Sequence, residues 1–144
     1  SEAIQAAEES FGVRLPRAYV SLLGERNGGT PKRRCFPTPF TTSWAPDHIG
    51  INAILGVGGE WGIDSEELGS RCLVTEWGYP DVGVVICATP SGGHDTVMLD
   101  YRECGPEGEP SVVYVDEDRI PQQIAGSFED FIGGLIECPP PELS

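Results

Sequence analysis

The sequence Leu15-Pro16-Arg17-Ala18-Tyr19, with Asn27-Gly28-Gly29 further along the chain, predicts a helix with a defined beginning and end. Pro16 takes a position in the first turn, where its missing N–H costs nothing. Leu15, Tyr19, Leu22 and Leu23 recur at the spacing of a core-facing helical stripe. Asn and Gly tolerate the left-handed backbone that a helix end needs, so we expect the helix to stop at residues 27–29.

Near the end of the chain, Ser127-Phe128-Glu129-Asp130-Phe131 predicts another helix. Ser127 is its N-cap, and Asp130 follows at the spacing of a capping box. Phe128, Phe131, Ile132, Leu135 and Ile136 form one apolar stripe, and we expect Pro139-Pro140-Pro141 to end the helix. A shorter first helix is expected to bury Ile4, Ala7 and Phe11 and to stop at Gly12.

The sequence between these helices is rich in glycine and proline and predicts strands. Residues 30–48 hold three prolines and suggest a loop or an edge strand. The turns 91–94 and 105–108 are too short for crossover helices, so the strands are expected to pair antiparallel. The predicted strands are residues 49–55, 72–76, 82–89, 96–101 and 112–115.

The order of these elements predicts an α+β fold, an antiparallel β-sheet with helices at the N- and C-terminal ends of the chain. The length of 144 residues fits one domain with its own core, and we expect it to span residues 1–138 with a frayed tail at 139–144.

The charge of the chain is strongly negative and unevenly placed. Its formal net charge is −14, yet residues 1–36 hold six basic and four acidic residues, and residues 37–144 hold three basic and nineteen acidic ones. Such a surface repels phosphate backbones, so we expect no direct binding of nucleic acid. It would attract a basic protein, and the competing interpretation is that the charge serves solubility alone.

The five cysteines are an odd number without a Cys-x-x-Cys pair, and Cys87 lies in an apolar run. This pattern favours reduced thiols and a cytoplasmic protein over a disulfide scaffold. No basic stretch followed by an apolar one begins the chain, and no apolar run approaches the ~18 residues of a membrane span.

Signs of catalysis are weak. The glycine-rich residues 56–62 have Trp61 where a dinucleotide-binding loop needs glycine, so we interpret them as a structural turn. His48 and His94 each adjoin an aspartate but show no metal-ligand spacing. A Cys–His pair formed in space stays open as an alternative. We therefore expect no enzyme, no metal and no cofactor.

Tryptophans beside acidic residues are typical of protein-binding surfaces, although buried core is the usual place of Trp. Trp44, Trp61 and Trp77 all lie in such surroundings, and the sequence does not choose between the two fates. As a partner-binding surface we predict Trp61 with two acidic runs, which contribute Asp64, Glu66, Glu67, Asp116, Glu117 and Asp118.

The motifs at both ends, with Gly92-Gly93-His94-Asp95 and Leu99-Asp100-Tyr101-Arg102 between them, resemble the SUKH superfamily. The match runs in order over about residues 4–137 and is poor over residues 30–70. The resemblance implies an α+β domain without a shared catalytic motif. It implies structural roles for the matching residues Leu15, Pro16, Tyr19, Asn27, Gly28, Gly93, Asp100, Tyr101, Phe128 and Phe131.

For bacterial members the resemblance implies an immunity protein that binds and neutralises a cognate polymorphic toxin, often a nuclease with a basic cleft. The alternative is a regulatory or scaffold module of the cell-wall assembly regulator type, which the fungal members resemble. A third interpretation, a small-molecule-binding domain, would require a closed apolar pocket.

Overall fold

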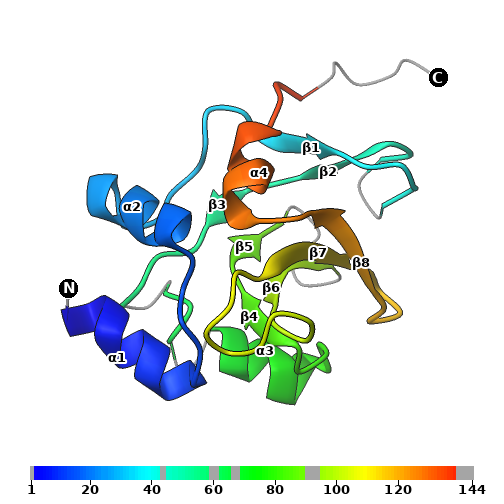
Figure 1. The fold of residues 1–144 in the computed structure, drawn as a ribbon. Coiled ribbons are helices and arrows are strands. Elements are labelled where there is room, and N and C mark those ends of the chain that lie inside the picture. The colour runs from blue at the N-terminus through cyan, green and yellow to red at the C-terminus, as the bar shows by residue number, and fades with distance from the viewer. Residues whose placement is uncertain (1, 43–44, 59–61, 66–68, 90–94, 139–144) are drawn as a thin grey trace.

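The computed structural model describes residues 2–42, 45–58, 62–65, 69–89 and 95–138. It is an α+β fold with helices near both ends of the chain, as the sequence predicts (Figure 1). The helices are α1 (Glu2–Phe11), α2 (Arg17–Glu25), α3 (Ser70–Trp77) and α4 (Phe128–Gly133). The strands are β1 (Cys35–Pro37), β2 (His48–Gly50), β3 (Ala53–Ile54), β4 (Gly83–Val85), β5 (Cys87–Ala88), β6 (Thr96–Asp100), β7 (Ser111–Val115) and β8 (Pro121–Ala125).

The strands form one larger sheet and two small ones, all antiparallel. The larger sheet has the order β4-β6-β7-β8, and β1 pairs with β2 as β3 pairs with β5. Ile86 joins the sheets, because its N–H donates to Val97 O at 3.0 Å and its carbonyl accepts from Leu55 N–H at 2.8 Å. The predicted strand 82–89 is therefore two strands, β4 and β5, in different sheets.

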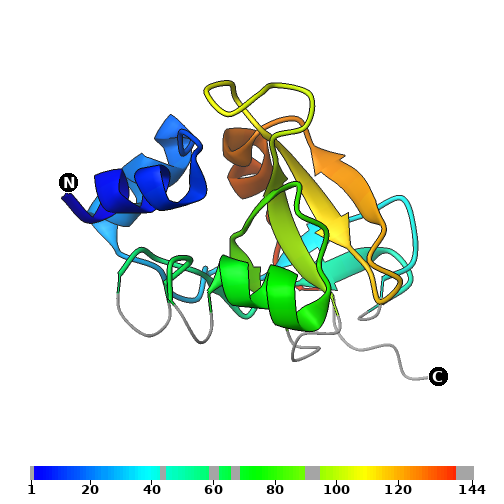
Figure 2. The ribbon, with the colours of Figure 1, turned by 90° about the horizontal axis from the view of Figure 1, so that it is seen from below.

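The helices take different sides of this framework. Figures 1 and 2 show α1 and α2 together on one side of the molecule and the β7–β8 hairpin on the other. Helix α4 packs on β7 and β8, whereas α3 packs on β4. None of the described helices is long and apolar enough to cross a membrane.

The predicted helix at residues 15–26 is confirmed, with two corrections at its ends. Pro16 is the N-cap of α2 and precedes its first turn, and its carbonyl accepts from Val20 N–H at 3.0 Å. The helix ends at Glu25 with extended Arg26 as C-cap. Gly28 and Gly29 have positive φ values of 84° and 133°, while Asn27 does not share this conformation.

Asn27 instead binds a distant loop. Its Nδ2 donates to Val57 O at 2.8 Å, and its Oδ1 accepts from Val57 N–H at 2.9 Å. The side chain thus continues the backbone pairing of a strand and fastens the loop after β3 to the end of α2. These two bonds are compatible with the structural role that the resemblance implies for Asn27.

We expect Asn27→Ala to lower the free energy of unfolding by about 1–3 kcal/mol, because the buried polar groups of Val57 lose both partners. Asn52→Ala is the matched control, since Asn52 is exposed and only its backbone is bonded. It should change the value by less than about 0.5 kcal/mol. Urea unfolding followed by circular dichroism measures both, and equal effects would contradict the role of Asn27.

Helix α3 corrects the predicted strand at residues 72–76. Leu73 and Val74 are partly buried against the core, and Gly78 ends the helix with φ 75°. Thr75 Oγ1 donates to Arg71 O at 2.9 Å, which satisfies its hydroxyl within the helix. Five residues, two of them β-branched, are too few to tell a strand from a partly buried helical turn by pattern alone, and here they form a helix that packs on the core.

Helix α4 begins as predicted and ends early. Asp130 N–H donates to Ser127 Oγ at 3.1 Å, which confirms the N-cap. The last helical residue is Gly133, so the prolines from residue 139 on do not end this helix. Ile136 belongs to a β-bridge with Cys35 instead of the helical stripe.

The core joins all layers, and the aromatic residues of the family motifs are at its centre. Tyr19 meets Phe128 edge to face with ring centroids 5.1 Å apart, and its hydroxyl donates to Leu55 O at 2.6 Å. Phe131 packs on Phe36 at 5.0 Å. The packing roles expected of Tyr19, Phe128 and Phe131 agree with their burial, and Leu15 is buried too.

The motif around Asp100 lies at the end of β6, an inner strand of the larger sheet. Burial raises the pKa of the Asp100 carboxyl, but hydrogen bonds from Arg102 outweigh this and hold it below its usual range. Arg102 Nη2 lies 2.7 Å from Asp100 Oδ2. Tyr101 donates its hydroxyl proton to Arg14 O at 2.7 Å and so ties the segment before α2 to the sheet. Gly93 lies outside the described residues.

The cysteine prediction is corrected by a disulfide between Cys35 and Cys138, which are 103 residues apart in the sequence. Cys72, Cys87 and Cys104 are free thiols. Cys35 is in β1 and Cys138 follows α4, so only the folded chain brings them together.

Candidate functional site

The predicted partner-binding residues divide into three groups. Trp61, Glu66 and Glu67 lie outside the described residues, as do Trp44 and His94. Asp64 and Asp116 each hold a loop together. Glu117 and Asp118 are exposed at the turn between β7 and β8.

The carboxylates of Asp64 and Asp116 accept backbone hydrogen bonds. Asp64 Oδ1 accepts from Gly58 N–H at 2.8 Å and so joins Asp64 to Gly58, six residues earlier. Asp116 Oδ1 accepts from Asp118 N–H at 3.0 Å and from Ile120 N–H at 3.1 Å. Substituting either aspartate would therefore change loop structure as well as surface charge.

Two large apolar side chains are exposed next to the acidic turn. Trp77 at the end of α3 is 49% exposed, and Ile120 before β8 is 55% exposed. Figures 1 and 2 both place the end of α3 beside the β7–β8 turn. We call the surface of Glu76, Trp77, Glu117, Asp118 and Ile120 the Trp77 face.

Arg119 joins the two elements of this face. Its Nε donates to Trp77 O at 3.1 Å, and its guanidinium carbon lies 4.0 Å from the centroid of the Tyr79 ring. Burial raises the pKa of Tyr79 to about 12, although the charge of Arg119 opposes this shift. Arg119 holds a positive φ of 63°, a conformation that non-glycine residues rarely adopt. Through its contacts with Trp77 and Tyr79, Arg119 fixes the β7–β8 turn relative to α3.

The positive charge of Arg119 is engaged in these structural contacts with Trp77 and Tyr79. Within the residues that the structure describes, no ion pair neutralises Glu76, Glu117 or Asp118, because the ion pairs found there are Asp47–His48 and Asp100–Arg102. The Trp77 face therefore combines exposed apolar side chains with exposed carboxylates that are neighbours in the sequence. That combination suits association with a basic protein surface.

Sequence reasoning weighed Trp77 without placing it in the predicted site, and it missed Ile120 and Arg119. An available signal was Arg119-Ile120-Pro121, an isolated large apolar residue between an acidic turn and a proline. The contact between Trp77 and Arg119 spans 42 residues of sequence and has no local signal.

A second polar cluster is buried in the sheet. Asp95 is only 2% exposed, and its two carboxylate oxygens accept from the hydroxyls of Thr89 at 2.8 Å and Tyr114 at 2.7 Å. Both oxygens thus have donors within the core, which is the usual state of a buried carboxylate in a structural role.

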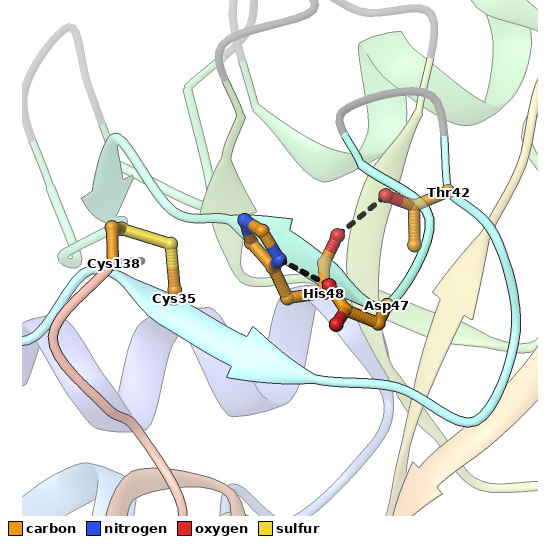
Figure 3. Close-up of a disulfide and its surroundings, with 5 residues drawn as sticks. All are labelled: Cys35, Thr42, Asp47, His48 and Cys138. Carbon is orange, nitrogen blue, oxygen red and sulfur yellow. Dashed lines mark hydrogen bonds and ion pairs between the residues drawn. A yellow bond between two sulfur atoms is a disulfide. The ribbon is translucent and has the colours of Figure 1, made fainter. Parts of the chain in front are cut away.

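The thiols and histidines described offer little for chemistry. Burial raises the pKa of the Cys87 thiol far above its usual range, and it also raises that of Cys104, so neither favours a nucleophilic thiolate. His48 Nδ1 lies 2.8 Å from Asp47 Oδ1 on β2 (Figure 3). Among the described residues, no three His, Cys, Asp or Glu side chains gather as metal ligands would.

Grooves on the surface are open and modest in size. One of about 370 Å³ lies between α1, α3 and β4, with apolar walls such as Phe11 and Val74 and the charged Arg71 and Asp81. The Arg71 guanidinium is already engaged there by Ser10 O and the Phe11 ring. This groove is not the closed apolar pocket that the small-molecule interpretation requires.

Comparison with known proteins agrees with the fold and the motifs. The SMI1 / KNR4 family (SUKH-1) matches residues 1–134, which include the four helices and the sheets of the described part of the chain. Neither the curated proteins nor the solved structures contain a match to the chain. The family match covers most of the 144 residues, and so the chain belongs to the SMI1/KNR4 family (SUKH-1).

Proposed function

We propose that this protein is an immunity protein that binds a basic toxin domain through the Trp77 face and neutralises it. Membership of the SUKH family supports the class, since immunity proteins are common among its bacterial members. The observation that carries the proposal is the exposure of Trp77 and Ile120 on two joined elements whose acidic residues no described ion pair neutralises.

Electrostatics would speed the encounter. Residues 37–144 carry sixteen more acidic than basic residues, so the field around the chain attracts a cationic surface from a distance. A nuclease toxin has such a surface, because its cleft must hold phosphates. The carboxylates of the Trp77 face would occupy that cleft and keep nucleic acid out.

Apolar contact would supply the lasting affinity. Exposed tryptophan is the side chain most enriched among residues that dominate binding energy, and Ile120 enlarges the dry centre of the contact. Arg119 holds both elements in place before binding, so little ordering remains to be done. The protein would act by occlusion rather than catalysis, in the cytoplasm where the toxin is made.

The first experiment isolates the partner and measures inhibition. Tagged protein is purified from its native cells in moderate salt, the bound proteins are identified by mass spectrometry, and any toxin domain found is assayed with added pure protein. Loss of toxin activity at one equivalent supports the proposal. Housekeeping partners, or a toxin that remains active, would instead favour the regulatory or scaffold alternative.

Variants of the Trp77 face then test the surface. We expect Trp77→Ala to weaken toxin binding about 30-fold, which corresponds to the loss of a residue worth about 2 kcal/mol. We expect the double variant Glu117→Lys/Asp118→Lys to weaken it at least tenfold in low salt, mainly through slower association. Asp116 is left intact, because its carboxylate holds the turn.

The matched control is Glu9→Lys/Glu25→Lys, which makes the same charge change at exposed positions of α1 and α2, away from the Trp77 face. It should weaken binding less than threefold. Surface plasmon resonance at several salt concentrations gives the rates, and melting curves confirm folding. If both pairs of charges matter equally, net charge rather than this face governs binding.

A further inference from the structure

The Cys35–Cys138 disulfide connects two segments that differ in accessibility. Cys35 is fully buried in β1, whereas Cys138 and its neighbour Glu137 are exposed in the segment after α4. The two Cα atoms are 5.0 Å apart (Figure 3). A thiol from solvent therefore meets the bond from the side of Cys138.

The segment held by this bond pairs with the first residue of β1 through an isolated antiparallel bridge between Ile136 and Cys35. Cys35 N–H donates to Ile136 O at 3.2 Å, and Ile136 N–H donates to Cys35 O at 2.8 Å. The other edge of β1 is paired with β2. Ile136 thus covers the backbone N–H and C=O of Cys35, which this edge of β1 would otherwise leave free.

The contacts of the segment become weaker toward its end. Leu135 is buried, but Ile136 is 39% exposed, and Glu137 and Cys138 are exposed. Beyond Leu135, the contacts described are the two backbone hydrogen bonds and the disulfide. The disulfide is therefore the main restraint on residues 136–138.

We propose that the Cys35–Cys138 disulfide is a reducible latch, which holds residues 136–138 on β1 when oxidised and opens the edge of β1 when reduced. A dithiol protein reductant of the thioredoxin class would open it. One of its thiolates attacks Cys138 Sγ, forms a mixed disulfide and releases Cys35 as a thiol after proton uptake. Its second thiol then displaces Cys138, so that the reductant is oxidised and two cysteine thiols remain.

The rest of the domain has packing contacts of its own besides the disulfide. Helix α4, which precedes residues 136–138, is anchored by its own side chains. Phe128 packs on Tyr19, and Phe131 packs on Phe36. The family match also ends at residue 134, before the latch begins. Reduction should therefore release a segment and leave the domain folded. This inference is independent of the toxin-binding proposal.

Hydrogen exchange with and without the reductant tests the latch on the full chain. We expect thioredoxin to reduce the bond without denaturant, and the amides of Cys35 and Ile136 then to exchange at least tenfold faster. The rise should exceed that at Val97 and Val113 in the central strands, and the dispersed NMR spectrum of a folded domain should persist. Cys138→Ser should show the fast exchange even without reductant.

Cys104→Ser is the matched control, because it removes a free thiol and keeps the latch. Its exchange at Cys35 and Ile136 should equal that of the parent protein. Three results would overturn the proposal: a bond that only denaturant makes reducible, unchanged exchange at these two amides after reduction, or loss of the folded spectrum on reduction. Loss of the folded spectrum would show that the disulfide is required for the fold.

Discussion

Phe128→Ala is expected to lower the free energy of unfolding by about 3–5 kcal/mol, the range for removing a buried phenylalanine ring. Phe128 is fully buried at the start of α4. Its ring meets Tyr19 of α2 at 5.1 Å and Phe131 of α4 at 6.1 Å, so it joins α2 to α4, the helix that packs on β7 and β8. Alanine would leave a cavity that the two neighbouring rings, fixed in their own packing, could not fill.

Urea unfolding of the oxidised protein measures this loss. Ile120→Ala is the control, since it removes an apolar side chain that is mostly in solvent, and it should change stability by less than about 0.5 kcal/mol. If Phe128→Ala cost less than about 1 kcal/mol, α4 would not be a structural support, and the latch proposal would lose the anchor it relies on.

Helix ends with a local chemical cause were predictable from the sequence. Ser127 accepts its capping hydrogen bond from Asp130 N–H, as the spacing of the two residues indicates. The end of the same helix was not predictable, because Ile136 fits the helical stripe but pairs with Cys35, a hundred residues earlier. Local patterns report local bonds, and this pairing is a tertiary contact.

Strands were predictable where burial makes them continuously apolar. β6 and β7 are buried in the middle of the sheet and were expected at nearly their observed bounds. β8 was missed, since Pro121-Gln122-Gln123 carries no strand propensity and is placed by pairing with β7. In α3 the error was the reverse: residues 72–76 were predicted as a strand from their propensity, but they form a helix that packs on β4.

The candidate site shows the same division. Composition and spacing predicted that acidic residues near 116–118 would be exposed, and Glu117 and Asp118 are. Sequence alone could not show that the Asp116 carboxylate accepts backbone hydrogen bonds within the turn. Nor could it show that Arg119 donates to the carbonyl of Trp77. The disulfide is the clearest case, because its cysteines lie 103 residues apart and their spacing carries no information about pairing.

Glycine at position 83 is expected to be indispensable, and the reason is a backbone contact rather than a turn. Gly83 lies in β4 opposite Asp100 of β6. A Cβ atom added there would lie 1.9 Å from Leu99 O and 3.0 Å from the Tyr101 ring. The carbonyl cannot rotate away without breaking the ladder between the two strands. We expect Gly83→Ala to cost more than about 3 kcal/mol, at or above the upper range for overpacked sites.

The same substitution at Gly24 should have the opposite sign. Gly24 lies inside α2, is exposed, and would place its new Cβ in open space. Alanine there should stabilise the protein by about 0.5–1 kcal/mol, because it restricts the unfolded chain and favours the helix. Thermal and urea unfolding of the two variants side by side give the comparison. A stable Gly83→Ala variant would mean that β4 and β6 can separate at this point, and that the edge of the sheet beside α3 is not fixed as described.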